Sequence, residues 1–158
     1  MLSNKFDKSL DGSGLKVAIV RARFNQEITD SLLKGCTDGL VDHGVSPDDI
    51  SVFDVPGSFE IILAAKKAAL SGEFDTVITI GAVIKGDTPH FDYISQAVTA
   101  GIVQINLEIE IPIIFGVITV LSLEQAQERA KPDKTNKGYE VAQAAIEMVK
   151  TCQKIDEI

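Results

Sequence analysis

Short runs rich in Val and Ile alternate along this chain with longer amphipathic segments, and this order repeats four times. The four runs have the length and composition of β-strands: Lys16–Val20, Ile50–Val55, Thr76–Ile84 and Ile113–Thr119. A strand–helix–strand connection places the second strand parallel to the first, so the alternation predicts an α/β fold with a four-stranded parallel sheet. The third run is almost entirely apolar, which is typical of a central strand covered on both faces. The sequence therefore predicts a three-layer sandwich with helices on both faces of the sheet.

The segments between these runs predict the helices. The clearest one, Ile28–His43, has a single apolar stripe at helical spacing and ends before Gly44. The others are Phe59–Leu70 with Ser58 as its N-cap, Asp92–Leu107, a short helix from a capping box at Ser122 to Ala130, and Asn136–Lys154. We expect residues 1–158 to form one domain, in which residues 1–14 are an arm on a neighbouring chain or an extra N-terminal edge strand.

The charge balance limits the partners of the chain. Against 15 Lys and Arg stand 23 Asp and Glu, and the formal net charge is −8. Sequence-independent binding of nucleic acid or of an anionic membrane needs surplus cations, so we expect neither partner. Only Arg21, Arg23 and Arg129 are arginines, which leaves few candidates for a phosphate site built on a guanidinium.

The cysteines and the hydropathy pattern predict a cellular compartment. Cys36 and Cys152 are too few for a disulfide scaffold, and each lies in a helix-like apolar pattern that favours core packing over a nucleophilic role. No apolar run reaches the roughly 20 residues of a membrane span, and the polar residues 1–10 do not resemble a signal peptide. We expect a reduced, cytoplasmic protein without membrane contact.

Ligands of parallel α/β sheets bind at the carboxyl ends of the strands, so the loops after the strands are the candidate site. In the first loop, Asn25 is either the N-cap of the next helix or a ligand contact, and Phe24 either packs under a neighbour or stacks on a ring. In the second loop, Gly57 turns the chain and leaves the amides of Ser58 and Phe59 free. Glu60 there complements the helix dipole or accepts hydrogen bonds from a polyol.

The third loop, Gly86–His90, follows the most apolar strand and precedes a helix. A glycine, a hydroxyl and unpaired helix N-terminal amides suit a phosphate. His90 is one of two histidines, and an imidazole suits proton transfer near neutral pH, although a loop histidine is more often a surface group. His43 lies near the end of a predicted helix, and the simplest interpretation is that it interacts favourably with the helix dipole.

Two further features lie outside these loops. Arg129 forms a positive cluster with Lys131, Lys134 and Lys137, which is either a solvated charge run or an anion site. Phe115 lies in the middle of a predicted strand, and by its position alone we expect it in the core.

Taken together, these segments resemble the 6,7-dimethyl-8-ribityllumazine synthase family of riboflavin biosynthesis. The resembling segments are Arg23–Asn25 with Ile28–Thr29, Val55–Glu60, Gly81–Tyr93, Phe115–Thr119, Glu124–Ala126 with Arg129, and Asn136–Gly138. Their order and spacing hold from about residue 15 to residue 148, and the combination is far more specific than any single segment.

The resemblance implies a transferase that condenses 5-amino-6-(D-ribitylamino)uracil with 3,4-dihydroxy-2-butanone 4-phosphate and releases phosphate and water. It implies no metal and no organic cofactor. His90 would be the acid–base group, and Phe24 would stack on the pyrimidine ring. The remaining contacts would be the backbone of Val83 and Ile84 for the ring edge, Asn25, Gly57, Ser58, Phe59 and Glu60 for the ribityl chain, and Gly86, Asp87, Thr88 and Arg129 for the phosphate.

The resemblance also implies a homo-oligomer with active sites between subunits. Phe115, Arg129 and Lys137 would reach the site from the adjacent subunit of a pentamer. Pentamers of this family also form icosahedral shells of sixty subunits, and a riboflavin synthase is a further partner of some assemblies. The segment Lys131–Thr135 lacks the family's usual glycines, which leaves the choice between pentamer and shell open, although the lack of an insertion favours the shell.

Two rival interpretations follow from the residues. A flavodoxin-like module that holds a flavin or a nucleotide phosphate, without condensation activity, would explain the topology and the third loop. It gives no role to His90 or to the cations around Arg129. A self-assembling scaffold that has lost catalysis is less favoured, because every expected site residue is present.

Overall fold

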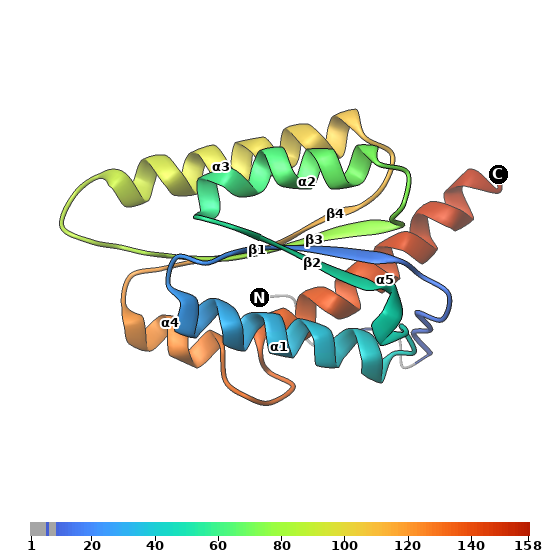
Figure 1. Cartoon of the computed structure of the whole chain (residues 1–158), viewed down its shortest axis with the longest axis horizontal. Helices are drawn as coiled ribbons and strands as arrows, with labels where there is room; N and C mark the ends of the chain where they lie inside the picture. The colour runs from blue at the N-terminus through green and yellow to red at the C-terminus, as the bar shows by residue number, and fades with distance from the viewer. Residues whose placement is uncertain (1–5, 7–8) are drawn as a thin grey trace.

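The computed structural model of the chain describes residues 6 and 9–158 (Figure 1). Within these residues four parallel strands form one sheet: β1 (Val17–Ala22), β2 (Ile50–Val55), β3 (Thr76–Ile84) and β4 (Ile113–Val120). Their order in the sheet is β2-β1-β3-β4. The parallel α/β sheet is thus confirmed. β1 continues two residues beyond the predicted end, because Arg21 and Ala22 still pair with Asp54 and Val55 of β2.

Helices cover both faces of the sheet, as predicted. Figure 1 shows α2 (Ile61–Leu70) and α3 (His90–Glu108) on one face, and α1 (Gln26–Asp42), α4 (Leu123–Arg129) and α5 (Lys137–Asp156) on the other. Alternate strand residues supply two separate cores: Ile19 and Ile78 pack toward α1 and α5, whereas Val20 and Val77 pack toward α2 and α3. None of the described helices is both long enough and apolar enough to cross a membrane.

The apolar stripe predicted for the first helix forms the centre of one core. Leu32, Cys36 and Leu40 are fully buried there against α5 and the sheet. Burial raises the pKa of the Cys36 thiol, which agrees with a core role for this side chain. Gly138, at the start of α5, lies so close to α1 that a Cβ atom on it would come 1.9 Å from the carbonyl oxygen of Leu32. Glycine at this position therefore sets how closely α1 and α5 approach.

Four local predictions were wrong. Ser58 does not cap a helix that starts at Phe59: residues Ser58–Glu60 form a 3₁₀ turn (η2), and α2 begins at Ile61. α1 begins at Gln26, two residues earlier than expected, and His90 is the first residue of α3 rather than part of the loop. Phe115 is 40% exposed, because β4 is an edge strand that the helices of its face leave partly uncovered.

The helix starts predicted at Ser122 and Asn136 agree better with the structure. Ser122 Oγ accepts a 3.2 Å hydrogen bond from the amide of Gln125, which is the first half of a capping box. In the second half, Oε1 of Gln125 accepts a 2.8 Å bond from the amide of Leu121 rather than from that of Ser122. Asn136 caps α5 by accepting a 2.7 Å bond from the amide of Gly138.

A 3₁₀ turn, Pro47–Asp49 (η1), precedes β2. Residues 6 and 9–14 form no strand, and the rest of the predicted arm or edge strand lies outside the described residues.

Candidate active site

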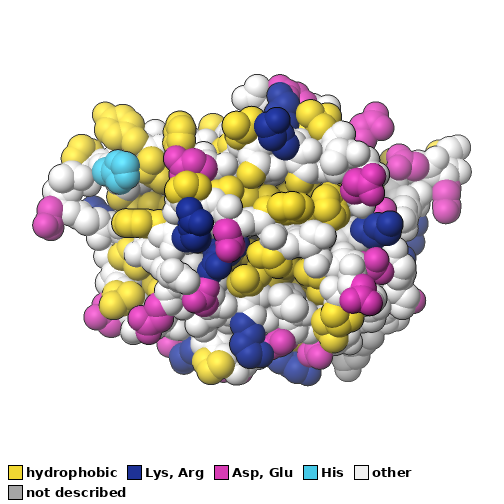
Figure 2. Space-filling model, viewed as in Figure 1, with side chains coloured by type: hydrophobic (Ala, Val, Ile, Leu, Met, Phe, Trp, Pro, Cys, Tyr) yellow, Lys and Arg dark blue, Asp and Glu magenta, His cyan; other side chains and the backbone are white. Residues whose placement is uncertain are grey.

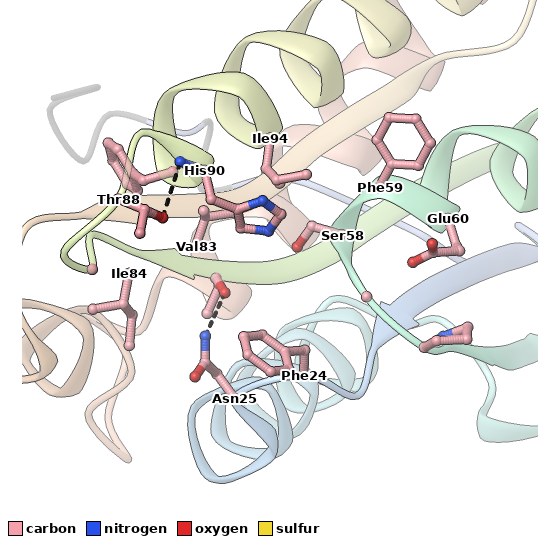
Figure 3. A pocket seen from close by; sticks show the side chains of 15 residues that line it. Phe24, Asn25, Ser58, Phe59, Glu60, Val83, Ile84, Thr88, His90 and Ile94 are labelled. Atoms are coloured by element: carbon pink, nitrogen blue, oxygen red, sulfur yellow. Dashed lines mark hydrogen bonds between the residues drawn. The ribbon is translucent and has the colours of Figure 1, made fainter.

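A cavity of about 520 Å³ opens at the carboxyl ends of β1, β2 and β3, where the sheet topology predicts a ligand site (Figure 3). Three loops surround it: the turn between β1 and α1, the turn between β2 and α2, and the longer loop between β3 and α3. The lining residues are Phe24, Asn25, Pro56, Gly57, Ser58, Phe59, Glu60, Ala82, Val83, Ile84, Gly86, Thr88, His90, Phe91 and Ile94.

Backbone hydrogen bonds join the first two loops. The amide of Arg23 donates a 2.8 Å bond to the carbonyl of Val55, and the amide of Phe24 donates a 3.1 Å bond to the carbonyl of Pro56. These bonds continue the pairing of β1 with β2 beyond the ends of both strands. The Phe24 ring is 71% exposed, so it does not pack under a neighbour within the chain and presents an aromatic face to the cavity.

Asn25 occupies the N-cap position of α1, but its side chain does not cap the helix. Its amide nitrogen instead donates a 2.8 Å bond to the carbonyl of Ala82 at the end of β3 (Figure 3). Its backbone is left-handed, with φ at 60°, the only such conformation of a non-glycine residue in the described part of the chain. Asn adopts this conformation more readily than most residues, so it can both form the turn and donate the bond to Ala82.

The second loop packs its serine against the central strand. Ser58 is buried, and a Cβ atom on Gly81 of β3 would come 2.7 Å from its Oγ, so glycine in β3 permits this close contact. The amide of Glu60 donates a 3.2 Å bond to the carbonyl of Gly57, which closes the 3₁₀ turn. Phe59 and Glu60 are exposed and line the cavity. The turn therefore presents a carboxylate and free backbone groups to a polar ligand.

The third loop brings the candidate phosphate and proton-transfer groups together. Thr88 Oγ1 accepts a long, 3.4 Å hydrogen bond from the amide of His90 at the start of α3. Figure 3 shows the His90 imidazole projecting from this helix end over Val83 toward Ser58, with Phe24 across the cavity. Gly86 and Thr88 line the same cavity, and the amides at the start of α3 add positive partial charge there.

A comparison with known protein families agrees with this geometry. Residues 14–153 match the family model described as 6,7-dimethyl-8-ribityllumazine synthase. The chain belongs to this family. Membership implies a transferase of riboflavin biosynthesis, and lumazine synthases are oligomeric.

The three residues expected from an adjacent subunit, Phe115, Arg129 and Lys137, do not line the cavity of this chain. Phe115 lies on the edge strand β4, and Arg129 ends α4, where its Nη1 donates a 3.3 Å bond to the carbonyl of Gln125. Lys137 begins α5, and its Nζ lies 2.9 Å from Oε1 of Glu140. Asp87, a predicted phosphate contact, also lies outside the cavity lining.

Some lining residues were not predicted from the sequence. The lining also includes Ala82, Phe91, Ile94 and Pro56, the last of which directly follows β2. Ile94 follows His90 by four residues on α3, so helical spacing could have identified it as a neighbour on the same helix face. Among residues 6 and 9–158, no group of three or more His, Cys, Asp and Glu is arranged to hold a metal ion.

Proposed function

We propose that this lumazine synthase family member condenses 5-amino-6-(D-ribitylamino)uracil with 3,4-dihydroxy-2-butanone 4-phosphate to 6,7-dimethyl-8-ribityllumazine. The observation that carries the proposal is the shared cavity of Phe24, Glu60 and His90, which come from the turn after β1, the 3₁₀ turn η2 and the first residue of α3. It combines an aromatic face, a polyol acceptor and a proton-transfer group beside the positive end of a helix. Its position in a chain whose family match covers residues 14–153 supports the same reaction.

In this proposal the cavity orients two substrates. Phe24 stacks on the pyrimidine ring, and the backbone of Val83 and Ile84 holds the ring's polar edge. The ribityl chain extends along Asn25 and the second loop, where Glu60 and the amides of Ser58 and Phe59 bind its hydroxyl groups. Gly57 allows the polypeptide backbone to turn at this loop. The phosphate of the second substrate lies at Gly86, Asp87 and Thr88, near the start of α3.

In this proposal His90 performs the proton transfers that the reaction needs. The substrate's amine attacks the ketone carbon, and loss of water from this adduct forms an imine. Loss of a proton from the adjacent carbon and departure of phosphate then give an enol, which becomes a ketone. Attack of the second nitrogen on that ketone closes the ring and releases a second water. Because each step is chemically modest, the positioning of the two reactants supplies much of the rate enhancement.

The proposal includes an active site that is completed by a second subunit. Arg129 would supply the counter-charge for the phosphate, and Phe115 and Lys137 would close the site. Exposed apolar surface supports an oligomer: Val52 and Phe53 of the edge strand β2 are exposed, as are Leu63 of α2 and Leu107 of α3. Figure 2 shows hydrophobic side chains in the band between the upper and lower helices. We propose a pentamer or a sixty-subunit shell in the cytoplasm.

The decisive test mixes both substrates with the purified protein and follows the fluorescence of the lumazine product. We expect product formation well above the spontaneous reaction of the two substrates. A rate equal to that background would overturn the proposal. A yellow protein that carries a flavin and shows no condensation would favour a flavodoxin-like binding module instead. Light scattering on the same sample distinguishes a pentamer from a sixty-subunit shell.

A further inference from the structure

Arg21, near the carboxyl end of β1, is paired with two carboxylates that belong to different elements. Its Nε donates a 2.8 Å hydrogen bond to Oδ1 of Asp54 on β2, and its Nη1 donates to Oδ1 of Asp30 on α1. The Arg21 side chain is only 9% exposed, whereas those of Asp30 and Asp54 are 53% and 41% exposed. One buried guanidinium therefore connects β1, the edge strand β2 and the first helix.

The three charged residues lie on both sides of the loop that carries Phe24. Arg21 lies two residues before Arg23, whose amide bonds to the carbonyl of Val55, the residue after Asp54. Asp30 lies one turn into α1, which begins directly after Asn25. The first loop of the cavity is thus held at both ends by the same guanidinium, while its backbone is bonded to the second loop.

Arg21 is not available as a phosphate ligand. It does not line the cavity, and it lies on the face of the sheet that α1 covers, where its charge is already matched by two carboxylates. The Arg21 guanidinium holds the pKa of the Asp54 carboxyl below its usual range through their hydrogen bond. The Asp54 carboxylate is therefore charged under ordinary conditions, and hydrogen bonds join the guanidinium to both Asp54 and Asp30.

We propose that Arg21, with Asp30 and Asp54, is a positioning residue that sets the place of Phe24 relative to the second loop. This inference rests on the proposed function, in which Phe24 stacks on the pyrimidine ring. The planar guanidinium suits this task because its Nε and Nη1 groups point in fixed, different directions and so fix two carboxylates at once. A lysine has a single nitrogen and cannot reproduce that geometry.

The test compares variants that weaken the connection with one that weakens an unrelated ion pair. Asp54→Asn and Asp30→Asn each remove one charge and keep the side-chain shape, and Arg21→Lys keeps the charge and loses the planar geometry. If a single variant fails to fold, the neutral combination Arg21→Met with Asp30→Asn and Asp54→Asn avoids an unpaired buried charge. Lys34→Ala is the matched control, because it removes an exposed ion pair with Asp38 within α1 alone.

Two measurements separate positioning from general stability. Hydrogen exchange reports whether the amides of Arg23 and Phe24 are released from Val55 and Pro56, and we expect exchange about tenfold faster there with β3 amides unchanged. Steady-state kinetics reports how each substrate responds. We expect KM for the ribitylaminouracil to rise about tenfold, while KM for the butanone phosphate and kcat change less than about twofold.

The outcomes also separate this inference from the proposed function. Unchanged exchange at Arg23 and Phe24 in folded variants would overturn the positioning role. Equal rises in both KM values, or faster exchange across β3 as well, would overturn it too, because they indicate a loss of general stability. If the wild-type protein makes no lumazine, the proposed function fails, and the exchange measurement still decides whether Arg21 holds the loop.

Discussion

The side-chain amide of Asn25 is bonded to the backbone carbonyl of Ala82 at 2.8 Å, which joins the turn after β1 to the end of β3. Asn25 has a left-handed backbone, which costs a residue with an ordinary Cβ about 1–2 kcal/mol. The turn that presents Phe24 therefore depends on a residue type that satisfies a backbone requirement and a hydrogen bond at once.

Substitutions at Asn25 should separate these two contributions. Asn25→Gly keeps the backbone conformation and loses the bond, so we expect the free energy of unfolding to fall by about 1 kcal/mol. Asn25→Ala loses both, and we expect a fall of about 2–3 kcal/mol. Urea denaturation measures the difference. Equal losses in the two variants would show that the left-handed backbone contributes nothing.

His90→Asn should impair the chemical step and leave ligand binding intact. Removal of a positioned acid–base group typically lowers a rate by at least about a hundredfold, so we expect kcat to fall by about that factor. Fluorescence titration with the lumazine product should give an affinity within about twofold of wild type, because the imidazole is not needed to stack the ring. His43→Asn is the control, since this ring bonds to the carbonyl of Gly39 outside the cavity. An unchanged kcat in His90→Asn would remove His90 from the mechanism.

Arg129→Ala should weaken binding of the phosphate substrate, with KM for the butanone phosphate raised by at least about tenfold. Lys154→Ala removes an exposed cation near the C-terminal end of α5 and should leave this KM unchanged. A shared active site adds a stronger expectation. When His90→Asn and Arg129→Ala subunits, both impaired at low butanone phosphate concentration, are reassembled together, about a quarter of the sites in a random ring regain both residues. A mixture without recovered activity would show that both residues act within one subunit.

The sequence was sufficient to predict the elements and the loops that form the cavity. An apolar run such as Thr76–Ile84 can be recognised as a strand from its own residues alone. The carboxyl ends of parallel strands necessarily meet at one edge of the sheet, so the loops that follow them also come together. The exposure of Phe115 could not be predicted in the same way, because it depends on which strand lies at the edge and how far the helices cover it. The role of Arg21 was missed because its partners Asp30 and Asp54 are brought together only by the fold.

Gly138→Ala should destabilise the contact between α1 and α5. The new methyl group would come 1.9 Å from the backbone carbonyl of Leu32, so the helices must separate, and overpacking of this kind costs about 2 kcal/mol or more. Gly86→Ala is the matched control, because a Cβ there meets nothing within 4 Å, and we expect a change within about 0.5 kcal/mol. Urea denaturation of both variants checks the difference. A Gly138→Ala protein as stable as Gly86→Ala would contradict the close packing of the two helices.

Tyr139 should make the protein sensitive to alkaline pH. Its hydroxyl donates a 2.9 Å bond to Asp42 on α1, and burial together with this bond raises the pKa of Tyr139 to about 12 from 10.0. Between these two values the unfolded chain loses the phenolic proton while the folded chain keeps it, so the free energy of unfolding falls as the pH rises, by on the order of 2 kcal/mol. Tyr139→Phe has no proton to lose and should show a shallower fall over that range in urea denaturation. Tyr93→Phe, at a ring that is 70% exposed, should follow the wild-type curve. Parallel curves for wild type and Tyr139→Phe would show that the Tyr139–Asp42 bond does not govern the alkaline transition.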